Sequence, residues 1–227
     1  QPYFLGTHEV TQQQYKEITG RNPSCFAQSG RRRDLSTKVE GQDTSSYPVE
    51  DMTWNEAVEF CDVLTESEGF APLHHGAGTP VELTGAGYRL PTEAEWEFAC
   101  RAGSTTKYWT GDTTVELADA AWSGQTANWV THPVGKLQPN AFGLFDIHGN
   151  VSEFVEDSWD AGFYGKFASE PAIDPYSPPP MGSRFVERGS NWYFHAPMCN
   201  SGARFAIEPT KRLESVGIRA VMTIAAQ

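Results

Sequence analysis

Apolar side chains recur at helical spacing in three stretches of the first half of the chain. The first stretch starts at Thr11, a residue type that caps helix N-termini, and continues with Tyr15 and Ile18 on one face. Gly20 ends the pattern, because glycine readily adopts the left-handed conformation that follows a helix. The pattern predicts a helix over about residues 11–20.

The second and third helical patterns also open with a threonine N-cap. Thr53 is followed by Glu56, which is the spacing of a capping box, and Thr92 is followed by Glu95 near the positive end of the helix dipole. Gly103 ends the third pattern. The predicted core positions are Ala57, Phe60, Cys61 and Leu64 in the second helix and Trp96, Ala99 and Cys100 in the third.

Beyond residue 103 the helical pattern stops and short extended segments follow. The extended segments are residues 142–145, 151–155, 184–189, 202–206 and 217–220. Residues 69–87 and 165–182 are rich in Gly and Pro and are predicted to be long loops. Helices first and short strands later indicate an α+β fold with few helices and much irregular structure. Without internal repeats or a linker, we expect a single domain over residues 1–227.

Composition and charge narrow the function classes. A net charge of −12 argues against general binding to nucleic acid, because phosphates attract Lys and Arg. The dense basic cluster at residues 31–33 lies in the polar stretch 28–46, which we expect to be a solvated loop. No apolar run approaches the roughly 20 residues of a membrane helix. Gln1 is not a natural start, so the removal of a leader and an extracytoplasmic or surface-associated location stay open.

Four motifs follow one another along the chain. They are EVT at residues 9–11 with Tyr15, RLPTEAEWE at residues 89–97, NAFGLFDIHGNV at residues 140–151, and RGS at residues 188–190 with GIR at residues 217–219. In this order they resemble the formylglycine-generating-enzyme, or sulfatase-modifying-factor, family over nearly the whole chain. The resemblance implies a C-type-lectin-like core wrapped in irregular structure.

The third motif matches a calcium site of the family that the chain resembles. The matching residues are Asp146, Gly149, Val151 and Glu153. Carboxylates and backbone carbonyls from a tight turn are the oxygen ligands that calcium prefers. The resemblance therefore implies a structural calcium ion here. The competing interpretation is that Asp146 and Glu153 cap turns or face water.

The chemistry of this family uses a pair of cysteines shortly after the Gly-Ser motif, since two thiolates suit soft copper(I). Here that segment contains only Cys199, and the positions nearest the pair are Tyr193 and either Ala196 or Met198. We therefore expect no dithiolate copper site and expect Cys199 to pack in the core.

In the family the same segment lines a substrate groove. The residues that the resemblance assigns to ligand binding are Ser190, Asn191, Trp192, Tyr193, His195 and Arg204. Aromatic faces beside hydrogen-bonding groups suit a peptide, protein or glycan ligand. We expect Asn191 and His195 to be exposed and Arg204 to hold a carboxylate or a carbonyl. For Trp192, a surface position and a core position are equally compatible with the sequence.

Two functions follow from this comparison. The preferred one is a non-catalytic ligand-binding module, as in the variable proteins of diversity-generating retroelements, which use this segment of the fold as their variable surface. The alternative is a divergent metal-dependent oxidase of the formylglycine-generating type that acts on a peptide cysteine. A third function is a regulatory partner domain, as in inactive paralogues of the enzyme. The sequence does not distinguish this function from the ligand-binding module.

The remaining histidines and cysteines carry weaker expectations. His74 and His75 are adjacent, so their side chains point apart and are expected at the surface rather than on a metal. The family often pairs the position of Cys100 with one near Ser201, which leaves a Cys100–Cys199 disulfide open.

Overall fold

A computed structural model describes residues 2–76, 79–180 and 182–224 of the protein. The two predicted loops, 69–87 and 165–182, contain residues 77–78 and 181, and the predicted domain also includes residues 1 and 225–227. These seven residues lie outside the described part of the chain.

The three predicted helices are confirmed, together with their caps. They are α1 (Gln12–Thr19), α3 (Trp54–Ser67) and α4 (Glu93–Arg101). Each begins at a threonine whose hydroxyl accepts the backbone N–H three residues on, while the side chain at that third position bonds back to the threonine N–H. Such N-caps contribute about 1 kcal/mol each. Gly20 ends α1 in the left-handed conformation, with φ of 76°.

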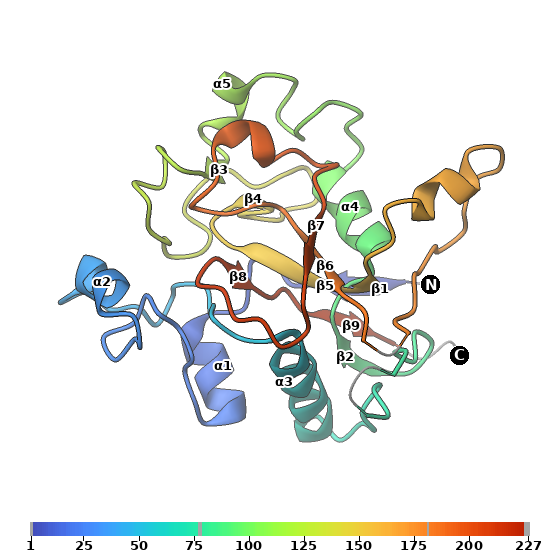
Figure 1. The fold of residues 1–227 in the computed structure, drawn as a ribbon, viewed down its shortest axis with the longest axis horizontal. Helices are drawn as coiled ribbons and strands as arrows, with labels where there is room; N and C mark the ends of the chain where they lie inside the picture. The colour runs from blue at the N-terminus through green and yellow to red at the C-terminus, as the bar shows by residue number, and fades with distance from the viewer. Residues whose placement is uncertain (1, 77–78, 181, 225–227) are drawn as a thin grey trace.

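Short strands form three small sheets in the middle of the molecule with these helices on the outside, so the α+β prediction is confirmed (Figure 1). The first sheet has the order β1 (Tyr3–Leu5), β9 (Val221–Thr223), β2 (Gly87–Arg89), and is antiparallel. The second joins β3 (Ala121–Trp122) to β4 (His148–Gly149). The third has the order β7 (Phe205–Ile207), β6 (Phe185–Arg188), β5 (Ser152–Ser158), β8 (Val216–Gly217).

Several local predictions are wrong. Helix α2 (Arg33–Ser36) and a 3₁₀ turn (Thr37–Val39) lie in the stretch expected to be a solvated loop, where Arg31 also pairs with buried Asp51. Residues 142–145 form a turn instead of a strand, because the Asn140 side chain accepts hydrogen bonds from two backbone N–H groups there.

Helix α5 (Thr114–Leu117) and 3₁₀ turns at Phe163–Phe167 and Ala196–Met198 follow residue 103, where no helix was expected. Each of these elements is too short for apolar periodicity to reveal it.

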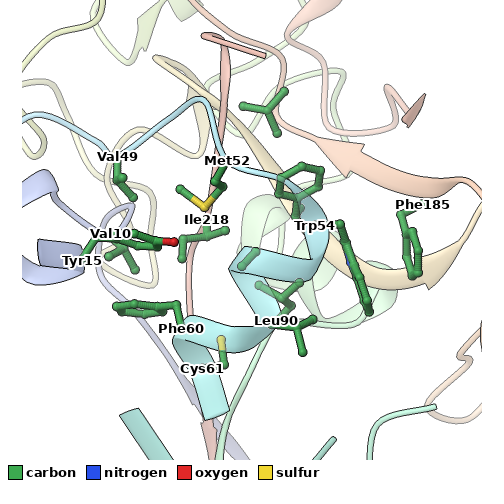
Figure 2. Close-up of a cluster of buried hydrophobic side chains, with 14 of the residues drawn as sticks. Val10, Tyr15, Val49, Met52, Trp54, Phe60, Cys61, Leu90, Phe185 and Ile218 are labelled. Carbon is green, nitrogen blue, oxygen red and sulfur yellow. The ribbon is translucent and has the colours of Figure 1, made fainter. Parts of the chain in front are cut away.

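The largest core cluster lies between α1, α3 and the sheets (Figure 2). Trp54 stacks on Phe185 of β6, with ring centroids 3.7 Å apart, and Tyr15 stacks on Phe60 at 5.3 Å. Cys61 is fully buried in this cluster, which confirms its prediction as a core thiol. In the described residues, no helix is long and apolar enough to cross a membrane.

His74 is buried between two carboxylates, so the expectation of a surface histidine is wrong. Its Nδ1 lies 2.9 Å from an oxygen of Asp62 on α3, and its Nε2 lies 3.2 Å from an oxygen of Glu156 on β5. Burial lowers the pKa of His74, but hydrogen bonds to Asp62 and Glu156 outweigh burial and raise it to about 9. The protonated ring therefore fastens the segment after α3 to the core.

Replacing His74 with Gln tests this ionic link. Because the folded-state pKa lies above the unfolded value of about 6.5, protonated His74 stabilises the fold fully below pH 6.5 and loses this contribution as pH rises through 9. The stability difference between wild type and His74→Gln should shrink by about 3 kcal/mol between pH 6.5 and pH 10. Urea unfolding across this range measures it, and a difference independent of pH would contradict the assignment.

Candidate functional site

A buried guanidinium closes the base of the loop that follows β6. Arg188, the last residue of β6, donates from Nη2 to the carbonyl oxygen of Ser201 at 2.6 Å. It also donates to Glu93 Oε1 at 2.9 Å and to Glu97 Oε2 at 2.6 Å, both on α4. Arg188 and Glu93 have fully buried side chains. Residues 189–201 therefore form a loop whose two ends are joined by one side chain and anchored to α4.

Arg204 is held by the same glutamate. Its Nη2 donates to Glu93 Oε2 at 2.7 Å, and its Nη1 donates to the carbonyl of Asp160. The guanidinium also lies over the rings of Trp159 and Tyr164. Arg204 is thus part of the anchor of the loop, and the ligand contact that the family resemblance implies for it stays a prediction.

The first residues of the loop are buried anchors. Ser190 is fully buried with φ of 62°, and Asn191 is buried as well, which contradicts its expected exposure. The Asn191 amide donates to Ser152 Oγ at 3.0 Å, and its Oδ1 accepts the backbone N–H of Tyr193 at 3.0 Å. Trp192 packs edge-on against Phe26 in the core and donates from Nε1 to a backbone carbonyl. These bonds fix the backbone from which the next side chains project.

An aromatic surface follows these anchors. We define it as Trp129, Tyr193, Phe194 and His195. Tyr193 is 60% exposed and Trp129 is 37% exposed, and His195 is exposed as expected. The Trp129 ring lies edge-on to Tyr193 at 6.1 Å and to His195 at 5.6 Å between centroids, and Tyr193 contacts Phe194 at 6.0 Å. The aromatic surface therefore joins two segments that are more than 60 residues apart in sequence.

Trp129 was not predicted as a site residue, and its position depends on a tight turn. Asn128 and Trp129 both have positive φ, at 49° and 58°. A Cβ at Gly124 would lie 3.2 Å from the Phe194 carbonyl oxygen and 3.4 Å from the Trp129 ring, so glycine permits the two segments to approach. Lys38 donates to the Trp129 carbonyl at 2.8 Å. Sequence spacing carries no signal for such a long-range approach.

Burial keeps the cysteine thiols of this protein protonated. All four cysteines are free and buried, and burial raises the pKa of Cys199 to about 11 and that of Cys100 to about 12. The core position expected for Cys199 is confirmed. Cys100 lies 3.8 Å from His148 Nε2, but burial lowers the pKa of His148 to about 3, so the imidazole is neutral and does not favour the thiolate.

The four residues that match a calcium site lie on and beside β4 and β5. Asp146 is buried, its Oδ2 accepts the Gly135 N–H at 2.6 Å, and its Oδ1 has no hydrogen-bond partner. The Glu153 carboxylate is saturated, because it accepts three bonds from Arg219 and one from Trp96 Nε1. Gly149 has φ of 91°, and Val151 is buried. Asp146 therefore fits a cation, whereas Glu153 fits one only if it exchanges a bond from Arg219.

Glu9 is a further carboxylate that sequence reasoning did not assign. It is fully buried, neither of its oxygens has a hydrogen-bond partner, and burial together with the charge of Asp146 raises its pKa well above the usual range. Within the described residues, no three His, Cys, Asp or Glu side chains are arranged to hold a metal ion.

Comparisons with known proteins support the family resemblance and the fold. The family model described as "Sulfatase-modifying factor enzyme 1-like domain" matches residues 1–224. Among solved structures, Treponema denticola variable protein 1 superposes with a TM-score of 0.83 at 31% identity, covering 97% of this chain and 84% of that one. PvdO from Pseudomonas aeruginosa superposes with a TM-score of 0.74 at 23% identity, covering 99% of this chain and 81% of that one, and shares the fold.

Two curated relatives are longer proteins. The formylglycine-generating enzyme of Thermomonospora curvata is 29% identical in a 197-position alignment that covers 78% of this chain and 56% of that protein. The chaperone protein LppX of Paenibacillus barcinonensis is 30% identical in a 186-position alignment that covers 67% of this chain and 61% of that protein. The chain thus spans less than two thirds of the length of these relatives.

Calcium binding at Asp146 and Glu153 stays a prediction. Calcium at about 100 times its dissociation constant should stabilise the fold by about 2.7 kcal/mol, which raises the melting temperature by about 5 to 10 °C. The chelator EGTA should reverse the shift, and Asp146→Asn should remove it, because the amide lacks the negative charge. Differential scanning calorimetry measures this. An unchanged melting temperature at millimolar calcium would contradict the calcium site and would mean that Arg219 alone neutralises the Glu153 carboxylate.

Proposed function

This chain belongs to the family of the sulfatase-modifying factor enzyme 1-like domain, and we propose that within it the chain is a non-catalytic ligand-binding member. The observation that carries this proposal is the aromatic surface. Exposed large aromatic side chains on a rigid base are the composition of protein recognition sites, because they give much contact area at a low cost in conformational entropy. The ligand that such a surface suits is a peptide, a protein or a glycan.

The chemistry of the 189–201 loop supports binding over catalysis. Tyr193 and either Ala196 or Met198 stand where the resembled enzymes have their cysteine pair. Cys199 is a buried residue of this loop with a raised thiol pKa, and it is the only cysteine in the loop. A divergent oxidase would therefore need thiolates that this loop does not present.

The loop has the organisation expected of a variable surface, and we extend the proposal to a variable protein of a diversity-generating retroelement. The anchoring contacts of Arg188, Asn191 and Trp192 are all made by buried groups. The side chains of Tyr193 and His195 project to solvent and can change without disturbing these contacts. Similarity to Treponema denticola variable protein 1 over 97% of the chain supports this extension.

Removing the exposed rings tests the binding proposal. Peptides selected on the wild-type protein from a random display library should bind Trp129→Ala/Tyr193→Ala at least about tenfold more weakly, because central aromatic side chains dominate interface energies. Isothermal titration calorimetry measures the affinities.

The matched control is Phe98→Ala/Phe142→Ala, which removes another exposed aromatic pair with ring centroids 5.6 Å apart. This control should bind the selected peptides like wild type. Equal loss in both double variants, or no loss in either, would contradict the proposal.

The oxidase alternative has a direct test. Wild-type protein incubated with copper(I), oxygen and a cysteine-containing sulfatase peptide should form no aldehyde, because no pair of accessible thiolates lies on the 189–201 loop. Mass spectrometry after hydrazide capture measures the aldehyde, with an active formylglycine-generating enzyme as the positive control. Sustained turnover would overturn the non-catalytic assignment.

A further inference from the structure

Glu187 on β6 is a buried carboxylate to which the fold gives no partner. The residue is 7% exposed, and within the described residues its carboxylate has neither an ion pair nor a hydrogen bond. Burial alone raises its pKa to about 7. Two other buried glutamates have defined partners, since Glu93 holds two arginines and Glu153 holds Arg219, whereas Glu9 also lacks one among the described residues but lies near Asp146 and Arg219 rather than beside the loop. A charge without a partner in the interior is costly, so an unpaired carboxylate at this position calls for a function.

The neighbours of Glu187 are aromatic rings that lead to the aromatic surface. In the sheet register, Glu187 stands opposite Phe205 on β7 and opposite Phe154 on β5. Opposed residues of antiparallel strands share a face, and their Cβ atoms lie about 4.5–5.5 Å apart. Phe205 stacks on Phe194 with centroids 5.4 Å apart and planes 6° from parallel, and both rings are partly exposed. Glu187 thus lies beside Phe205, whose ring stacks on Phe194 of the aromatic surface.

We propose that Glu187 receives a basic side chain of the bound ligand, a lysine ammonium above all, which enters beside the Phe194–Phe205 ring pair. This inference rests on the proposed function and names the class of its ligand. A carboxylate forms charge-assisted hydrogen bonds with an ammonium group, and the faces of aromatic rings attract the same cation. The ammonium group of the ligand would then be the ion-pair partner that the Glu187 carboxylate lacks within the fold.

Charge favours a basic peptide or protein over a neutral glycan. A hydroxyl group of a sugar would leave the Glu187 charge uncompensated, whereas an ammonium group neutralises it. The net charge of −12 on the chain also attracts a cationic partner over distance and repels an acidic one. Glu187 therefore narrows the three ligand classes to peptides and proteins that present a lysine or arginine.

A pair of short peptides tests the lysine site. The probe is acetyl-Gly-Lys-Gly-amide, and its Nε-acetylated form is the matched neutral peptide. NMR titration of protein labelled with ¹³C in the glutamate carboxylates should show saturable binding of the lysine peptide, with the Glu187 signal shifting. Glu187→Gln should bind it about tenfold more weakly, because the shape is kept and the charge is lost. The neutral peptide should bind wild type no better than it binds Glu187→Gln.

Two further variants complete the experiment. Glu66→Gln removes one negative charge from an exposed position of α3 and should bind the lysine peptide like wild type. Phe194→Ala should weaken binding about threefold through the lost ring face, so the test does not depend on a buried substitution. Equal binding of the lysine peptide to wild type and Glu187→Gln, or no binding to wild type, would overturn the inference.

The failures of the two proposals are distinguishable. If library-selected peptides require Trp129 and Tyr193 but bind Glu187→Gln like wild type, the lysine site is wrong and the binding surface stands. If the selected peptides are indifferent to Trp129 and Tyr193, the proposed function itself fails.

Discussion

The buried contact between Glu93 and two arginines is the constraint on which the candidate surface depends. Arg188 and Arg204 stand on either side of the 189–201 loop, and one carboxylate on α4 accepts bonds from both. Removing one partner of such a buried pair typically costs about 3–5 kcal/mol, because the other charge is left uncompensated. Since Arg188 also bonds the carbonyl of Ser201, the ends of the loop are fixed before any of its exposed side chains is considered.

This arrangement separates the part of the loop that maintains the fold from the part that meets solvent. Asn191 and Trp192 satisfy their polar groups within the protein. The rings of Trp129 and Tyr193 pack against each other edge-on and keep their outer faces free. A rigid base with exposed rings loses little conformational entropy when a ligand binds. This is the physical reason that the aromatic surface suits recognition. Glu187 lies opposite Phe205, whose ring stacks on Phe194 of this surface.

Much of the fold could be predicted from the sequence, because helix caps are local. Thr53 and Glu56 identify the start of α3 from residues three apart. The site was harder to predict from the sequence, because its geometry depends on partners that are distant along the chain. Asn191 is buried by a bond to Ser152, 39 residues away, and Arg204 is held by Glu93, 111 residues away. Trp129 meets Tyr193 only through the fold. The family resemblance indicated the right segment, but the roles of these side chains needed their three-dimensional contacts.

The central claim is that ligands bind on the aromatic surface, and a crystal structure of the protein with a library-selected peptide tests it most directly. The account predicts that the peptide lies across Trp129 and Tyr193 with its own side chains against their rings. A peptide bound elsewhere, such as in the groove lined by Phe4, Ile18 and Phe60 beside the first sheet, would contradict the account.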